Sequence, residues 1–103
     1  MKHDGHTILG PGGTIRIEGD ALASLVVAAA EHVEGARVRR PRRGLVVAIA
    51  DGRARVELEL AVRYGASLPD LGAAVQHEVS DALRISAGLE VDSIDVSIEE
   101  LEQ

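Results

Sequence analysis

The feature that most constrains the fold is a long run of alternating residues in the middle of the chain. From Arg53 to Arg63, apolar side chains recur at every second position and charged side chains lie between them. A period of two indicates a β-strand with one buried and one hydrated face. The apolar set is Val56, Leu58, Leu60 and Val62, and the charged set is Arg55, Glu57, Glu59 and Arg63. Asp51-Gly52 precedes the run and favours a tight hairpin turn with the apolar stretch Leu45 to Ala50.

Two other segments show the periodicity of amphipathic helices. The first follows Asp20, which is placed to cap it, and runs to about Val33 before Gly35. The second runs from Leu68 to about Ala87 and ends at Gly88. Their apolar stripes are Leu22, Leu25, Val26, Ala29 and Val33 in the first, and Leu68, Leu71, Val75, Val79 and Ala82 in the second. We expect each helix to bury its stripe against a sheet.

Two further strands complete the predicted fold, at Thr14 to Glu18 and at Val91 to Ile98. The order is then β-α-β-β-α-β, which is ferredoxin-like and belongs to the α+β class. We expect a two-layer sandwich, with a four-stranded, mainly antiparallel sheet and both helices on one face. Residues 14–98 form this single domain. The Gly-rich residues 1–13 are expected to be a flexible arm, and residues 99–103 an acidic fringe.

Composition excludes several kinds of site. The chain of 103 residues has no cysteine, which excludes disulfides, thiolate catalysis and zinc sites built on sulfur. Tyr64 is the single aromatic residue, so bases or flat cofactors have no aromatic platform on which to stack. The longest apolar stretch falls far short of a membrane span, and the start lacks the apolar core of a secretory signal. We therefore expect a cytoplasmic protein without direct membrane insertion.

The charge is unevenly distributed along the chain. Five of the eleven cations lie between residues 37 and 43, and they are Arg37, Arg39, Arg40, Arg42 and Arg43. The rest of the chain contains six cations and all seventeen acids. The last fourteen residues contain six of these acids and no basic residue. Pro41 and the crowded arginines exclude an interior strand here, so the segment is a loop or a frayed edge. A charged edge also discourages unwanted strand pairing, which is the alternative to a binding role.

Short patterns spread over nearly the whole domain resemble one family. Gly13-x-Ile15-x-Ile17 precedes the first helix, and His32-Val33-Glu34-Gly35 ends it. Asp51-Gly52 is followed by the alternating strand and Tyr64-Gly65. Val75-Gln76-x-x-Val79 and Gly88-Leu89-x-Val91-x-x-Ile94-x-Val96-x-Ile98 complete the order. The chain thus resembles the alkaline shock protein 23 family of bacterial envelope stress response proteins. It departs from the family at Ala36, where a larger aliphatic residue is usual, and in the arginine-rich loop.

The resemblance implies a small non-enzymatic protein that associates with itself. It also implies, for some members, attachment near the membrane through a separate anchor protein. It gives no catalytic residues to carry over and implies no cofactor.

Few residues are candidates for catalysis or metal binding. His3 and His6 with Asp4 could form a weak metal site on a mobile segment. The alternative interpretation is that these residues belong to an unstructured tail. His32 and His77 lie on different helices beside acids, where a hydrated surface is the plainer interpretation. The Gly10 to Gly13 stretch precedes a strand, so it lacks the helix N-terminus of a phosphate-binding loop. We predict no enzyme activity, no metal and no cofactor.

The leading hypothesis is an interaction module that assembles with itself and binds a membrane-anchored protein. The arginine-rich loop is its predicted partner-binding surface. One alternative is a nucleic-acid-binding domain that uses the same five arginines, which the net charge of −6 disfavours. A second alternative is a small-ligand regulatory domain of the same fold order.

Overall fold

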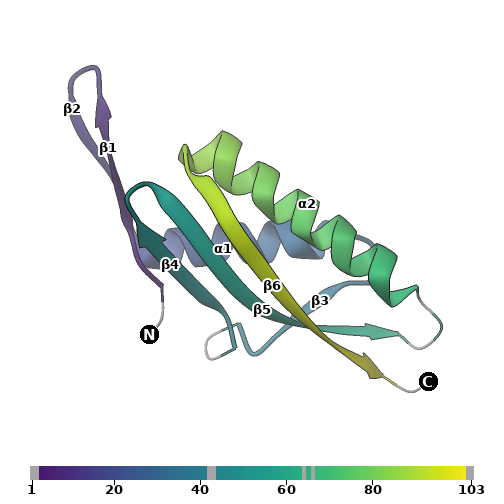
Figure 1. Cartoon of the computed structure of the whole chain (residues 1–103). Helices are drawn as coiled ribbons and strands as arrows, with labels where there is room; N and C mark the ends of the chain where they lie inside the picture. Colours follow the sequence, from purple (N-terminus) through teal and green to yellow (C-terminus); the bar gives the residue numbers. More distant parts are fainter. Residues whose placement is uncertain (1–2, 42–43, 64, 66, 102–103) are drawn as a thin grey trace.

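The computed structural model describes residues 3–41, 44–63, 65 and 67–101. They form two layers, a sheet and a pair of helices, with a small hairpin projecting from one end (Figure 1). In chain order the elements are β1 (His6–Gly10), β2 (Gly13–Ile17), α1 (Gly19–Glu31), β3 (Arg37–Arg39), β4 (Val46–Ala50), β5 (Arg53–Arg63), α2 (Leu68–Ala87) and β6 (Glu90–Leu101). The predicted α+β class is confirmed.

The main sheet is built around β5. β6 pairs with β5 in parallel along its whole length, and β3 and β4 pair with it antiparallel. Two of the three pairings are therefore antiparallel. Because β6 occupies one edge of β5, β3 and β4 share the other edge. The helix α2 connects β5 to β6, as a parallel pair requires a crossover connection.

β3 and β4 behave as one strand interrupted by the arginine-rich segment. Arg39 pairs with Glu59 and Val46 pairs with Glu57, so Leu58 alone separates the two paired stretches on β5. The expected edge is present, since residues 37–39 are an edge strand, and Arg40 and Pro41 lie outside it.

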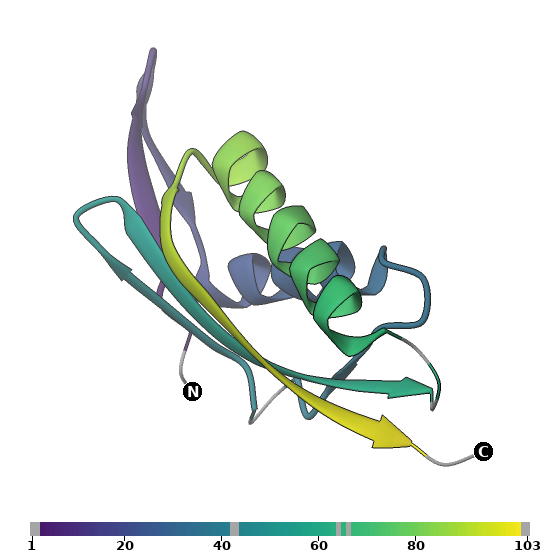
Figure 2. The ribbon, with the colours of Figure 1, turned by 45° about the vertical axis from the view of Figure 1, so that its right-hand side comes forward.

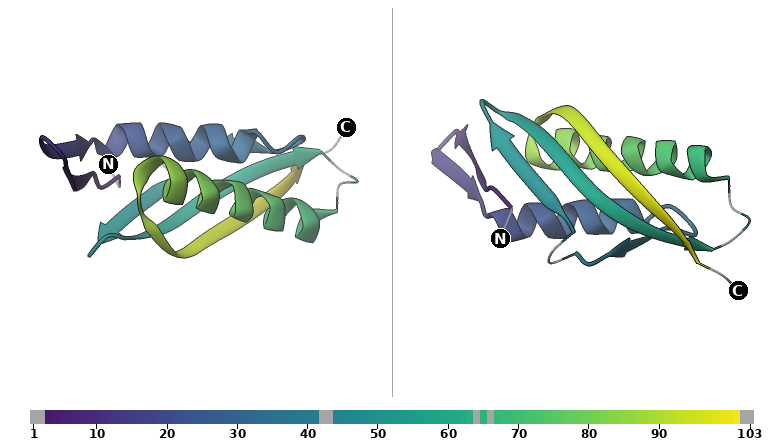
Figure 3. Two further views of the ribbon diagram at one scale, coloured as in Figure 1. Left: turned by 90° about the horizontal axis from the view of Figure 1, so that it is seen from above. Right: turned by 60° about the horizontal axis from the view of Figure 1, so that its bottom comes forward.

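Both helices cover the same face of the sheet, and the other face carries no helix (Figures 2 and 3). The core between the layers is entirely apolar among the described residues. Its largest fully buried side chains are Leu22, Leu45, Leu58, Leu60, Leu83, Leu89, Val26, Val47, Val56, Val62, Val75 and Val79. The alternation predicted from Arg53 to Arg63 is therefore correct in register, since Leu58 is 2 % exposed and Glu57 is exposed.

The predicted first strand forms at Gly13–Ile17 but does not join the main sheet. In the described part of the chain β2 pairs with β1 alone, and β1 is a strand that the sequence did not predict within the expected arm. The fourth strand of the sheet is instead β3. A turn at Pro11-Gly12 brings β1 and β2 together locally, and this closure costs less chain entropy than pairing β2 with a distant strand.

The described residues near both ends of the chain pair with or contact the rest of the domain. The backbone N–H of Asp4 donates to the carbonyl of Val47 at 2.8 Å, and His3 forms a parallel bridge with Val47. The carbonyl of His3 passes close to Gly19, where any side chain would collide with it. β6 continues to Leu101, with an irregularity opposite Ala54 and Arg55. Asp20 lies in the first turn of α1 and not at its cap, which is Glu18.

Candidate interaction surface at the arginine-rich loop

The structure describes three of the five arginines predicted to bind a partner. Arg37 is exposed and Arg39 is half-buried, and both lie in β3. Arg40 is exposed and has a positive φ of 48°, the left-handed conformation with which the chain leaves the strand. Arg42 and Arg43 lie outside the described residues.

Buried residues hold the loop at both of its ends. Val38 lies within its first residues and Leu45 follows it, and they are 9 % and 1 % exposed. The backbone N–H of Gly44 donates to the carbonyl of Arg40 at 2.6 Å, which closes the loop on itself. The N–H of Val38 donates to a carboxylate oxygen of Glu31 at 2.9 Å, so α1 also fixes β3. Arg37, Arg39 and Arg40 are therefore held next to buried or hydrogen-bonded residues.

Part of the acidic carboxyl-terminal region lies beside these arginines in the same chain. Arg39 forms an ion pair with Glu99 of β6, and the pair spans the open face of β5. The side chains are 32 % and 54 % exposed, so water screens the attraction. The charge asymmetry of the sequence is thus partly neutralised within one molecule, while Arg37 and Arg40 keep their charge exposed.

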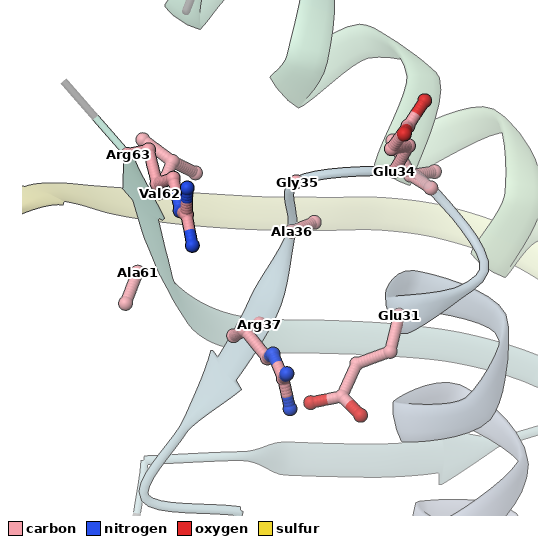
Figure 4. A pocket seen from close by; sticks show the side chains of 9 residues that line it. Glu31, Glu34, Gly35, Ala36, Arg37, Ala61, Val62 and Arg63 are labelled. Atoms are coloured by element: carbon pink, nitrogen blue, oxygen red, sulfur yellow. The ribbon is translucent and has the colours of Figure 1, made fainter.

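A hollow of about 530 Å³ lies beside Arg37, between the end of α1 and the strands β3 and β5 (Figure 4). Ala36 and Ala61 are small and buried there, at 4 % and 8 % exposure. Arg37 and Glu31 extend toward each other in this hollow. Its charged lining consists of Glu31, Glu34, Arg37 and Arg63. Two cations and two anions give the hollow no preferred ligand charge.

The histidine candidates are placed separately. The Nε2 of His3 lies 2.9 Å from the carbonyl oxygen of Leu45, and Asp4 accepts a bond from the N–H of Ile49. The ring of His77 contacts Asp81 on its own helix at 3.2 Å. His32 lies at the end of α1 and lines a groove between the helices. Within the described part of the chain, no three histidine, aspartate or glutamate residues are grouped as metal ligands.

The sequence predicted the charged face of β5 but assigned it no role beyond hydration. Arg53 donates to Asp92 at 2.6 Å, and this hydrogen bond and the carboxylate charge raise the pKa of the Arg53 guanidinium. Arg55, Glu57 and Glu59 have no ion-pair partner among the residues that the structure describes. The pattern Arg-x-Arg-x-Glu-x-Glu was visible in the sequence, but it was interpreted only as a hydrated face.

Comparison with known proteins identifies the family. A family model for the alkaline shock protein 23 family, with a cell envelope-related function, matches residues 36–103. The chain belongs to this family. The match covers β3 and everything after it, which includes the arginine-rich loop, the central hairpin and the crossover through α2. The resemblance seen in the sequence is therefore confirmed.

Solved structures of the MamM CTD have a similar fold. A nickel form of one variant has a TM-score of 0.64 at 22 % identity, covering 80 % of this chain and 98 % of that one. A copper form of another variant has a TM-score of 0.63 at 23 % identity, covering 80 % and 96 %. At this identity the likeness supports the ferredoxin-like fold of this family member and nothing more specific.

The search of curated proteins finds no match for the chain. Among the described residues, no helix is both long enough and apolar enough to span a bilayer.

Proposed function

We propose that this chain is a non-enzymatic interaction module of the cell envelope that assembles with itself and binds a membrane-anchored protein from the cytoplasmic side. Membership of a family with a cell envelope-related function supports the setting. The single observation that carries the interaction role is the arginine-rich loop, whose base is buried while Arg37 and Arg40 are exposed. Five arginines so close together repel one another, a cost that an acidic partner surface offsets.

The partner-binding residues in this proposal are Arg37, Arg39, Arg40, Arg42 and Arg43. A protein partner is favoured over nucleic acid because the whole chain has a net charge of −6, which repels a polyanion at long range. Arg39 is already paired with Glu99, so we expect the other four to contribute more to binding. Such exposed contacts weaken as salt is added.

The test uses a loop variant with Arg37, Arg40, Arg42 and Arg43 changed to Ser, which leaves the Arg39–Glu99 pair intact. A control changes the exposed Arg16 and Arg84 to Ser, which removes two positive charges from elsewhere on the surface. In cells that produce the protein, the membrane-associated fraction is expected to fall for the loop variant and to stay unchanged for the control. Equal membrane association of all three proteins contradicts the loop assignment.

Two measurements on purified protein separate the partner classes. Wild-type protein is expected not to float with protein-free vesicles of anionic lipid and not to shift RNA or duplex DNA tightly. Flotation assigns the loop to lipid headgroups, and a tight shift that the loop variant loses assigns it to nucleic acid. Sedimentation over a concentration series tests self-association, and a mass that stays monomeric throughout overturns that part of the proposal.

A further inference from the structure

The open face of the sheet carries a charge pattern that is complementary to itself. Along β5 the outward residues are Arg53, Arg55, Glu57 and Glu59 in that order. The central two are exposed, and neither has an ion-pair partner within the described ranges. No helix covers this face, as the right-hand view of Figure 3 shows. β5 therefore contributes two cations followed by two anions to this face, and the exposed Asp95 of β6 lies beside Glu57 on it.

We propose that the open face of β5 binds the same face of a second copy about a two-fold axis, with Arg55 of each copy opposite Glu57 of the other. The proposal rests on the self-association in the proposed function and names the surface responsible. A two-fold interface requires that residue i contact residue j while j contacts i. Consider a two-fold axis that lies in the interface, runs across β5 and passes over Val56, between Arg55 and Glu57. It places Arg55 of each copy opposite Glu57 of the other, so the reciprocal contact is made twice.

The same axis matches the next pair outward. It brings Arg53 of one copy over Glu59 of the other, so these four charges each face an opposite charge, while Arg63 lies beyond the matched part of the strand. The Asp92 carboxylate already holds the Arg53 guanidinium in place. Glu59 is half-buried because its carboxyl group lies next to Gly44, so we expect the central pair to contribute most. An axis parallel to β5 would instead place arginine over arginine, which opposes association.

Apolar contacts accompany the charges. On β4, Val46 is paired with Glu57 and Ala48 is paired with Arg55, so these two residues share the open face. Both are half-buried in the single chain. The axis through Val56 brings Val46 of one copy over Ala48 of the other. Burial of this stripe supplies attraction that salt does not screen.

The test exchanges charges at the central pair, where substitution breaks no internal ion pair. Arg55→Glu makes the row acid against acid in a homodimer, and Glu57→Arg makes it base against base. We expect each single variant to dimerise at least about tenfold more weakly than the wild type in sedimentation experiments at low salt. A mixture of the two variants is expected to form a heterodimer, detected with copies of different mass.

The double variant Arg55→Glu/Glu57→Arg provides the decisive control for folding and charge. It is expected to dimerise with itself as the wild type does, but not with the wild type. Arg63→Glu makes the same charge change farther along the same face and is expected to leave dimerisation unchanged. The differences among the variants are expected to shrink at high salt.

The outcomes separate this inference from the proposed function. If the wild type associates but both single variants associate equally well, the open face is not the interface and self-association stands. If the single variants fail to pair with each other, the two-fold arrangement is wrong. If the wild type is monomeric at every concentration, both the inference and the self-association in the proposed function are overturned.

Discussion

Arg39 on β3 and Glu99 on β6 form an ion pair that reaches over the central strand of the sheet. The pair joins the two edges of the sheet at the end near the arginine-rich loop. It also means that one of the five arginines has an acidic partner in its own chain. The side chains are partly exposed, so the pair orients Arg39 more than it stabilises the fold.

We expect a double-mutant cycle of Arg39→Ser and Glu99→Gln to give a coupling energy below about 1 kcal/mol. The reason is solvent screening of a pair that is about one third to one half exposed. The measurement is chemical denaturation of the wild type, both single variants and the double variant at low salt. A coupling several times larger would mean that the pair is far less hydrated than its exposure indicates.

Leu58→Ala is expected to lower the free energy of unfolding by about 2–5 kcal/mol, because Leu58 is 2 % exposed in the centre of the core. Glu57→Gln is the matched control, because Glu57 is adjacent to Leu58 in the sequence but its side chain lies on the open face. We expect this change to alter the free energy of unfolding little. Urea denaturation at a protein concentration where the wild type is monomeric measures both. Equal damage from the two changes would contradict the register of β5.

Glu31→Ala is expected to destabilise β3 by about 1–2 kcal/mol, because the N–H of Val38 loses its acceptor in a partly buried position. Glu31→Gln keeps an oxygen acceptor and is expected to retain most of the stability. Hydrogen exchange at the amide of Val38 is the direct measurement, with faster exchange expected for Ala and near-native exchange for Gln. Unchanged protection in both variants would show that the side chain does not hold the strand.

Two glycines at α2 are expected to respond to alanine with opposite signs. Gly88 ends the helix at φ 69°, so Gly88→Ala forces a side chain into the left-handed region and is expected to cost roughly 1 kcal/mol. Gly72 lies inside the helix, and an added Cβ would meet Ile98 at an ordinary 3.5 Å. Gly72→Ala is expected to stabilise by roughly 0.5–1 kcal/mol through helix propensity. Thermal or chemical unfolding that shifts both in the same direction contradicts this account.

Purified protein is expected to bind no stoichiometric nickel or copper, although forms of the MamM CTD carry those metals in their descriptions. The physical reason is that three ligands do not converge anywhere in residues 3–41, 44–63, 65 or 67–101. Calorimetric titration with each metal, with elemental analysis of the unsupplemented protein, is the measurement. One metal per chain, lost in His3→Ala, would revive the amino-terminal site.

The sequence predicted the parts of the fold that local periodicity specifies. Alternation placed Leu58 inward, and Gly88 ended α2, because these signals lie within a few residues of what they determine. It did not predict that β2 would pair with β1 instead of the main sheet. Strand partners depend on contacts between distant residues and on the cost of closing loops, which no single segment reveals.

The candidate site shows the same division. The position and charge of the arginine-rich loop could be predicted, since Pro41 and its neighbours exclude an interior strand. The pairing of Arg39 with Glu99 could not, because it depends on β6 lying beside β5 in a particular register. The expected acidic fringe is in part a strand of the sheet, and its Glu99 is a neighbour of the loop.

The interruption between β3 and β4 at Leu58 has a consequence for how this domain can diversify. Because β3 and β4 are each held by β5, the connection between them can change in length and composition without moving the strands on either side. The connection between β3 and β4 is therefore a position where insertions and grafted sequences are tolerated. Under the proposed function, replacing this single short segment changes the partner while the rest of the domain retains its geometry.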